Sequence, residues 1–165
     1  MRLVRAMDEF TRRELIGRYR DGYAEVMRAL DGCTSEELDR RTAPDQWSAR
    51  EIVHHLGDSE MTSAIRLRRL IAEEGPLIQG YDQEEYARRL FYDRPIEASL
   101  AAFRAAREST AEILDRLTAE QWQRHGTHSE SGAYDATKWL QIYAAHAHNH
   151  ADQIRRARVR NTHNP

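Results

Sequence analysis

Three of the eight histidines in this chain have the spacing expected of residues that bind one metal ion. His146 and His150 are four positions apart, so on a helix their side chains share a face, with Cβ atoms roughly 6 Å apart. A zinc ion about 2.0–2.1 Å from each imidazole nitrogen can bridge that separation. His55, on a facing helix, would complete a three-histidine site with positions left open for water or substrate. The spacing therefore predicts a reactive metal centre.

The residues around these histidines indicate that all three side chains point into a protein core. His55 lies about 10 Å beyond the predicted start of its helix, which places the site near one end of the molecule. His54 is rotated by about 100° from that face, and His148 and His163 also point elsewhere. The residues that share a face with the three histidines are Ile52, Leu56 and Ser59 on one helix and Trp139, Tyr143 and Ile154 on the other.

A metal site is one of two interpretations that the spacing leaves open. A lone inward-facing histidine is more often a hydrogen-bonded core residue, and two histidines four positions apart can occur by chance in an arginine-rich helix. Asp58 and Glu60 could support the metal ligands or act as a general base, but on a charged helix a solvated role is the simpler interpretation. Gln153 could orient a ligand or could pack at a helix crossing.

Three further features have weaker interpretations. Arg66 lies about 16 Å along the helix from His55, and we expect it to be a structural ion-pair partner. The polar segment 125–137, which includes His128 and Glu130, is predicted to be a loop that could line the entrance or simply form polar surface. Cys33 lacks an activating neighbour and is interpreted as structural.

Apolar residues recur at helical spacing almost everywhere, and no convincing alternating strand is visible. The clearest start is at Ser48, where Glu51 completes a capping box and Trp47 could pack on Ile52. Gly75 and the proline after it should end that helix. These patterns predict an all-α fold, a four-helix bundle with short connecting helices. The predicted helices are 9–30, 34–38, 48–74, 82–90, 95–117, a short turn from 118, and one from 135–137 to about 159.

Length and composition predict a single soluble domain, residues 1–160, followed by a flexible tail, 161–165. One cysteine excludes a disulfide framework, and no apolar run suits a signal peptide or a membrane span, so we expect a cytoplasmic protein. The 25 basic and 27 acidic residues are interspersed, with a net charge of −2. Neither nucleic acid nor membrane is therefore an expected partner, whereas a small-molecule substrate is.

The chain resembles the DinB superfamily, and within it the YfiT-like group of proteins, which are named as metal-dependent hydrolases, often by inference. The resemblance covers most of the chain from about residue 41 onward, in the family's order and spacing. It rests on WSAREIVHHLGDSEM at 47–61 with its continuation to Leu67, on Tyr81-Asp82 and Pro95-Ile96, on His128-x-Glu130-x-Gly132, and on YAAHAHNHADQI at 143–154.

This resemblance implies a four-helix bundle that binds a divalent metal ion, zinc or nickel, through His55, His146 and His150. It also implies a homodimer. Activities known in the family include transfer of low-molecular-weight thiols and thiol-dependent isomerisation. Two positions depart from the pattern: Asn149 and Gln153 stand where relatives often carry histidine, which could alter the surroundings of the ligands.

The leading functional hypothesis is a metal-dependent hydrolase that uses metal-activated water at the three-histidine site. A second is a metal-dependent S-transferase in detoxification, for which a low-molecular-weight thiol would be a cofactor. A third is a non-catalytic metal-binding protein of the stress response, in which Asp58 or His128 would supply a fourth ligand. A helical interaction module with core histidines is the remaining alternative.

Overall fold

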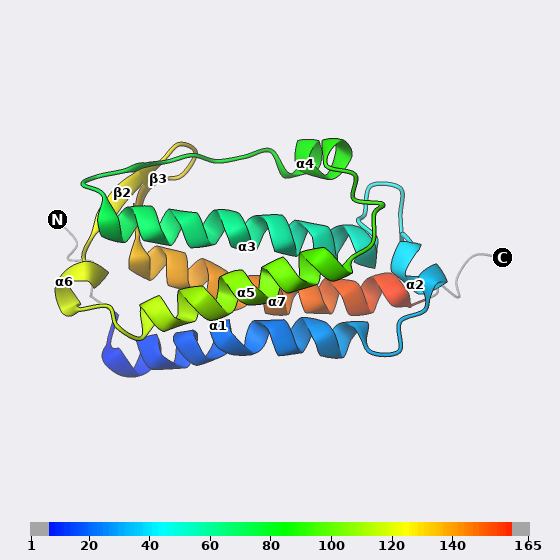
Figure 1. Cartoon of the computed structure of the whole chain (residues 1–165), viewed down its shortest axis with the longest axis horizontal. Helices are drawn as coiled ribbons and strands as arrows, with labels where there is room; N and C mark the ends of the chain where they lie inside the picture. The colour runs from blue at the N-terminus through cyan, green and yellow to red at the C-terminus, as the bar shows by residue number, and fades with distance from the viewer. Residues whose placement is uncertain (1–6, 160–165) are drawn as a thin grey trace.

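Four long helices form most of the molecule and lie side by side along its longest axis (Figure 1). The computed structural model describes residues 7–159, so the predicted tail and His163 lie outside the described residues. The predicted four-helix bundle is confirmed. The long helices are α1 (Glu9–Leu30), α3 (Ala49–Ala72), α5 (Glu97–Leu114) and α7 (Ala136–Arg158).

Side-chain caps define where the two histidine-bearing helices begin. Ser48 caps α3: its hydroxyl accepts from the backbone N–H of Glu51 at 3.3 Å, and the Glu51 carboxylate accepts from the Ser48 N–H at 2.8 Å. This is the predicted capping box. Asp135 caps α7 by accepting from the Lys138 N–H at 2.7 Å. Each cap contributes about 1 kcal/mol and fixes the position of the histidines that follow along the helix.

The helices form a four-cornered bundle in which each contacts two neighbours. Helix α7 packs against α1 and α3, and α5 packs against the same two helices. The colour gradient in Figure 1 shows that α1 and α7 run in one direction and that α3 and α5 run in the other. Parallel α3 and α5 require a long return connection, which carries β1 (Leu77–Ile78) and α4 (Gln83–Arg89) along the outside of α3.

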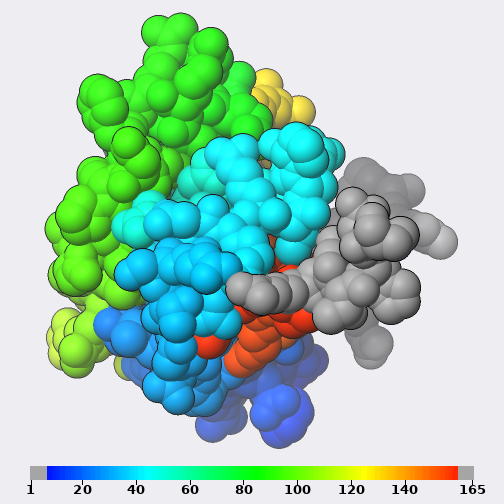
Figure 2. Space-filling model, turned by 90° about the vertical axis from the view of Figure 1, so that its right-hand side faces the viewer, coloured from blue at the N-terminus to red at the C-terminus, as the bar shows by residue number. Residues whose placement is uncertain are grey.

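Short helices cover the two ends of the bundle. At one end, α2 (Ser35–Asp39) and its flanking segments lie across the ends of the long helices, as the light-blue and cyan surface in Figure 2 shows. At the other end lies α6 (Ala119–Trp122). Both short helices begin with capping boxes, headed by Thr34 and Thr118. The predicted element order is therefore observed, with helix ends shifted by a few residues.

A small sheet is the feature that the sequence analysis missed. Strands β2 (His125–His128) and β3 (Gly132–Asp135) form an antiparallel hairpin where a loop was predicted, and β1 pairs parallel to β2. Four-residue strands rich in glycine and histidine give too short an alternation to recognise. Gly126 allows β2 to approach the segment that precedes β1, because a Cβ at position 126 would lie 2.4 Å from the carbonyl oxygen of Pro76.

A layer of buried polar side chains divides the hydrophobic core into two clusters. One cluster includes Leu67, Leu70, Trp139 and Leu140, and the other includes Ile52, Leu56, Phe103 and Ile154. The buried polar residues between them are Ser59, Glu60, Ser63, Arg107 and Thr110. The described helices are amphipathic, and none has the length and apolar character needed to cross a membrane.

An ion pair at the centre of this layer joins three helices. Arg107 on α5 donates from Nη2 to Oε2 of Glu60 on α3 at 2.6 Å. Tyr19 on α1 donates its hydroxyl proton to the other carboxylate oxygen, and its carbonyl oxygen accepts from Arg107 Nη1. Glu60 is 0% exposed and Arg107 1% exposed. Each partner thus satisfies a group that would otherwise be costly to bury.

We predict that Gly22→Ala destabilises the protein, because a Cβ at position 22 would lie 2.7 Å from Cβ of Ala147 and 2.7 Å from Nη1 of Arg107. Overpacking of this kind costs about 1–3 kcal/mol. The matched control is Gly17→Ala on the same helix, where a Cβ meets nothing within 4 Å. The control should raise the free energy of unfolding by up to about 1 kcal/mol through helix propensity. Urea unfolding of both variants measures this, and equal shifts would contradict the packing argument.

Candidate metal centre

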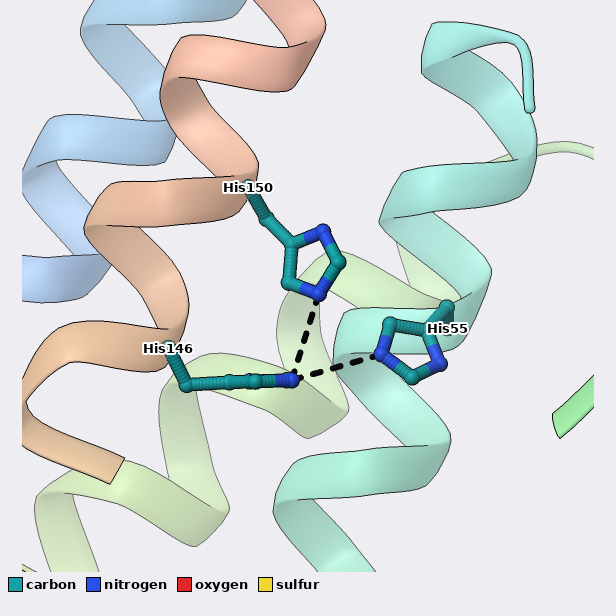
Figure 3. A group of neighbouring side chains, drawn as sticks. All are labelled: His55, His146 and His150. Carbon is teal, nitrogen blue, oxygen red and sulfur yellow. Dashed lines mark hydrogen bonds between the residues drawn. The ribbon is translucent and has the colours of Figure 1, made fainter. Parts of the chain in front are cut away.

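The side chains of His55, His146 and His150 converge on one point between α3 and α7 (Figure 3). Nε2 of His146 lies 3.3 Å from Nε2 of His55 and 3.2 Å from Nε2 of His150. All three ligand atoms lie within 4.8 Å of one another. The structure therefore brings together the three histidines that the spacing selected.

These separations fit a tetrahedral metal ion. Two ligand atoms on a tetrahedral ion with bonds of about 2.0–2.1 Å are about 3.3–3.4 Å apart. The two Nε2 separations at His146, 3.3 and 3.2 Å, are close to that value. Among the described residues, no fourth histidine, cysteine or carboxylate side chain joins these three histidines in one group of ligand atoms. Three neutral nitrogens would leave coordination positions open to small molecules.

Burial keeps the three imidazoles neutral, which is the form that binds metal. Burial, together with the repulsion that a protonated His55 would meet from a protonated His150, lowers the pKa of His55 to about 3. The pKa of His146 is lowered well below its usual value, mainly by burial and by the neighbouring histidines. Burial also lowers the pKa of His150, and its hydrogen bond to Gln153 partly opposes this. At neutral pH all three rings therefore carry a lone pair on one nitrogen.

Neighbouring side chains orient the rings. Nδ1 of His150 lies 2.8 Å from Oε1 of Gln153, so Nδ1 carries the proton and the lone pair on Nε2 faces the other histidines. Gln153 thus orients the His150 ring, which is the orienting role considered for it. The His55 ring packs on Trp47 at 4.9 Å between ring centroids, and the His146 ring packs on Tyr143 at 5.7 Å.

A cavity of about 230 Å³ extends from His146 toward the β2–β3 hairpin. Its walls come from α3, the segment after β1, the hairpin and α7. His128 and Glu130 line it, which confirms that this polar segment borders the site. The other lining residues are Ser59, Arg66, Tyr81, Gln83, Ser131, Tyr134, Ile142 and Tyr143.

The two carboxylates considered as a general base are both engaged by other groups. Asp58 accepts a hydrogen bond from the Tyr92 hydroxyl at 2.7 Å. Glu60 was expected to be solvated, and that expectation is wrong, because its two oxygens bind Tyr19 and Arg107 inside the core. The sequence could not show this, because Glu60 and Arg107 are 47 positions apart.

Arg66 and Tyr81 are the residues whose role the sequence analysis missed. Arg66 was expected to form an ion pair, but among residues 7–159 no carboxylate lies within 4 Å of its guanidinium nitrogens, so that expectation is wrong. It lines the cavity instead, together with Tyr81. Tyr81 comes from the connection after β1, whose course along α3 no local pattern indicates. The Tyr81-Asp82 match within the family resemblance was its one signal.

The remaining histidines and the cysteine have separate roles. Nδ1 of His54 lies 2.8 Å from the Ser99 hydroxyl, and its Nε2 lies 2.9 Å from the carbonyl oxygen of Arg94. Nε2 of His148 lies 2.9 Å from a backbone carbonyl of α1. Burial raises the pKa of Cys33, so this thiol is not activated. Each placement agrees with the sequence analysis.

Two other features resemble sites but lack this chemistry. Asp21, Glu25 and His148 lie close enough to bind an ion, but Arg28 and Arg155 already pair with Glu25. A larger cavity, about 650 Å³, lies between α1 and α5, which carry none of the three converging histidines. The convergence on His146 is therefore the candidate functional site.

Comparison with known proteins relates this architecture to one family. The sequence profile of the DinB superfamily matches residues 18–154. A protein of Oceanobacillus iheyensis, named "putative metal-dependent hydrolase", is 37% identical over 120 residues, which cover 73% of this chain and 70% of the relative. A protein of Halalkalibacterium halodurans with the same description is 27% identical over 124 residues, 75% of this chain and 72% of the relative.

A solved structure shows the same fold. YfiT from Bacillus subtilis, described as a probable metal-dependent hydrolase with an unusual four-helix bundle topology, superposes with a TM-score of 0.87. The match covers 95% of this chain and 91% of YfiT, at 24% sequence identity. At that identity the likeness establishes the fold of the bundle.

We predict that Glu60→Ala lowers the free energy of unfolding by about 3–5 kcal/mol, because it leaves Arg107 charged and unpaired in the core. The control is Glu108→Ala, which removes a surface ion pair with Arg104. The Arg104 side chain is 59% exposed and the Glu108 side chain 62% exposed. The control should change stability by less than about 1 kcal/mol. Denaturant unfolding compares the two variants, and similar losses would contradict a structural role for Glu60.

Proposed function

The chain belongs to the DinB superfamily, and within that family we propose that it is a metal-dependent hydrolase of small molecules. One observation carries the proposal: three neutral imidazoles, that of His55 buried and those of His146 and His150 half-buried, place their Nε2 atoms at the separations expected of ligands on one ion. The names of its relatives point to the same class of reaction. We propose zinc or nickel as the ion.

The proposed ligands are His55, His146 and His150, all through Nε2. A divalent ion bound there would act as a Lewis acid and make a coordinated water acidic near neutral pH, which suits hydrolysis of esters and amides. Because the described chain brings three ligating side chains to this point, the site favours catalysis over a closed structural centre.

The surrounding residues orient the proposed ligands and border them with aromatic rings. Oε1 of Gln153 accepts a hydrogen bond from Nδ1–H of His150 and thereby fixes both the tautomer and the orientation of this ring. Trp47 packs on His55, and Tyr143 packs on His146. These contacts supply an apolar border in which a charge on the substrate would interact strongly with its partners.

One observation favours the S-transferase as a second candidate. The cavity beside His146 contains Arg66, a cation without a carboxylate partner in the described part of the chain, which would suit an anionic thiol. The non-catalytic candidate needs a fourth ligand from Asp58 or His128. Asp58 is instead bound by Tyr92, and Nδ1 of His128 accepts from the Glu130 N–H at 3.2 Å. This makes a closed site the weaker alternative.

We expect wild-type protein to retain one equivalent of zinc or nickel and the His146→Ala and His150→Ala variants to retain none. His148→Ala is the matched control. His148 lies on the same helix as His146 and His150, but its side chain binds a backbone carbonyl of α1, so its loss should not affect the metal. Elemental analysis measures metal content. A turnover screen of the loaded proteins, with esters, amides and thiol–electrophile pairs, measures activity.

The outcomes of these measurements separate the candidate functions. Hydrolysis of an ester or amide without thiol supports the hydrolase, and turnover that requires thiol supports the S-transferase instead. Unchanged metal content in both histidine variants would contradict the site. A metal-loaded protein that is inactive on every class of compound would favour the non-catalytic candidate.

We further expect Gln153→Leu to weaken metal affinity about 10- to 100-fold, because His150 loses the acceptor that orients it. Gln153→Glu keeps an acceptor at the same position and should retain most of the affinity. Competition titrations with a chelating dye measure both variants. Equal affinity of wild type and Gln153→Leu would show that Gln153 serves only in packing.

A further inference from the structure

The cavity beside His146 contains an arginine that forms no ion pair with any carboxylate of residues 7–159. Nη1 of Arg66 donates to the Tyr143 hydroxyl at 3.2 Å, and Nη2 donates to the carbonyl oxygen of Gln79 at 2.8 Å. Nε of Arg66 is buried and has no hydrogen-bond partner among the described residues. A guanidinium has five N–H groups, so an edge including Nε–H remains for a planar acceptor with two oxygens.

Two tyrosine hydroxyls lie with this guanidinium at the cavity wall. The Tyr81 hydroxyl is buried beside Ser59, and in the described part of the chain it has no hydrogen-bond partner of good geometry. The Tyr81 ring lies under the Arg66 guanidinium, 5.8 Å from centroid to Cζ. The Tyr143 hydroxyl accepts from Arg66 and has a proton of its own to donate. The cavity thus presents several donors and one full positive charge.

None of the nearby acidic groups among residues 7–159 pairs directly with that positive charge. Glu60 is neutralised by Arg107, and Asp58, which keeps its charge, accepts a hydrogen bond from the Tyr92 hydroxyl. Glu130, at the cavity mouth, is exposed and packs on Gly80, where a Cβ would lie 2.5 Å from its Cδ. A single guanidinium with one exposed carboxylate at the mouth suits a singly charged anion better than a phosphate dianion.

Tyr143 connects this anion-binding wall to the histidines. Its hydroxyl contacts Arg66, and its ring packs on His146 at 5.7 Å between centroids. One phenol ring therefore separates the guanidinium from a proposed metal ligand. A molecule of a few carbon atoms could reach both, and a cavity of about 230 Å³ restricts the ligand to that size.

We propose that this cavity is a carboxylate subsite, in which Arg66, with the Tyr81 and Tyr143 hydroxyls, binds the carboxylate of a short substrate whose reacting group lies at the three histidines. The substrate class is thus a small monocarboxylate with a hydrolysable bond or a thiol a few atoms from its carboxylate. The carboxylate-binding part of this proposal is supported by the cavity residues alone. The placement of the reacting group rests on the proposed function.

The test uses 3-mercaptopropionate and its uncharged analogue 3-mercaptopropionamide as probes of zinc-loaded protein. Calorimetric titration should show the acid binding about 10- to 100-fold more tightly than the amide, as expected for charge-assisted hydrogen bonds. In Arg66→Met the two probes should bind equally, at the affinity of the amide. Arg66→Lys keeps the charge but loses the planar edge, so its preference should be intermediate.

Arg69→Met is the matched control. Arg69 lies on the same helix, and its side chain pairs with Glu73. This variant should keep the full preference for the acid. A second readout needs no variant to fold: the Nε–H resonance of Arg66 in nitrogen–proton spectra should shift on addition of the acid and stay unmoved by the amide.

Equal affinities of acid and amide for the wild type, or a preference that survives in Arg66→Met, would overturn the subsite. Inorganic phosphate that shifts the Arg66 resonance at lower concentration than the acid would also overturn it. Failure of the protein to bind zinc would instead contradict the proposed function. In that case, the Arg66 resonance in metal-free protein titrated with propionate still decides the subsite, and an unmoved signal contradicts it.

Discussion

The need to satisfy polar groups inside an apolar bundle shapes this molecule. The ion pair between Glu60 and Arg107, completed by Tyr19, links α1, α3 and α5 in a layer that divides the core. Removal of either charge would leave its partner buried and unpaired, so the helices are held in one relative position. Three imidazoles from α3 and α7 lie beside this layer, and their geometry depends on that position.

The histidine cluster and the cavity together describe a site with two ends. One end is neutral, partly buried and rich in nitrogen, as a metal ligand set requires. The other end carries the charge of Arg66 and faces the β2–β3 hairpin. The return connection after α3 makes this possible, because it brings Tyr81 over the helix that carries Arg66. The unusual course of the chain thus builds the pocket, while the regular helices position the ligands.

Local signals predicted most of the fold and the histidine cluster. The capping box at Ser48, the helical periodicity and the four-residue spacing of two histidines are all readable within one turn or two. The parts that were missed depend on long-range partners. Glu60 pairs with Arg107 on another helix, and Arg66 has no carboxylate partner among the described residues. Tyr81 reaches the cavity through a connection that has no recognisable local pattern. The hairpin could not be predicted because its four-residue strands are too short to show an alternating pattern and are recognised only by their pairing.

The central claim is that three histidines bind one ion and leave coordination positions open. X-ray absorption spectroscopy of the zinc-loaded protein counts the ligands most directly. We expect three imidazole nitrogens at about 2.0–2.1 Å and one or two oxygen atoms from solvent. A shell of four protein ligands without solvent, or zinc bound with fewer than three imidazoles, would contradict it.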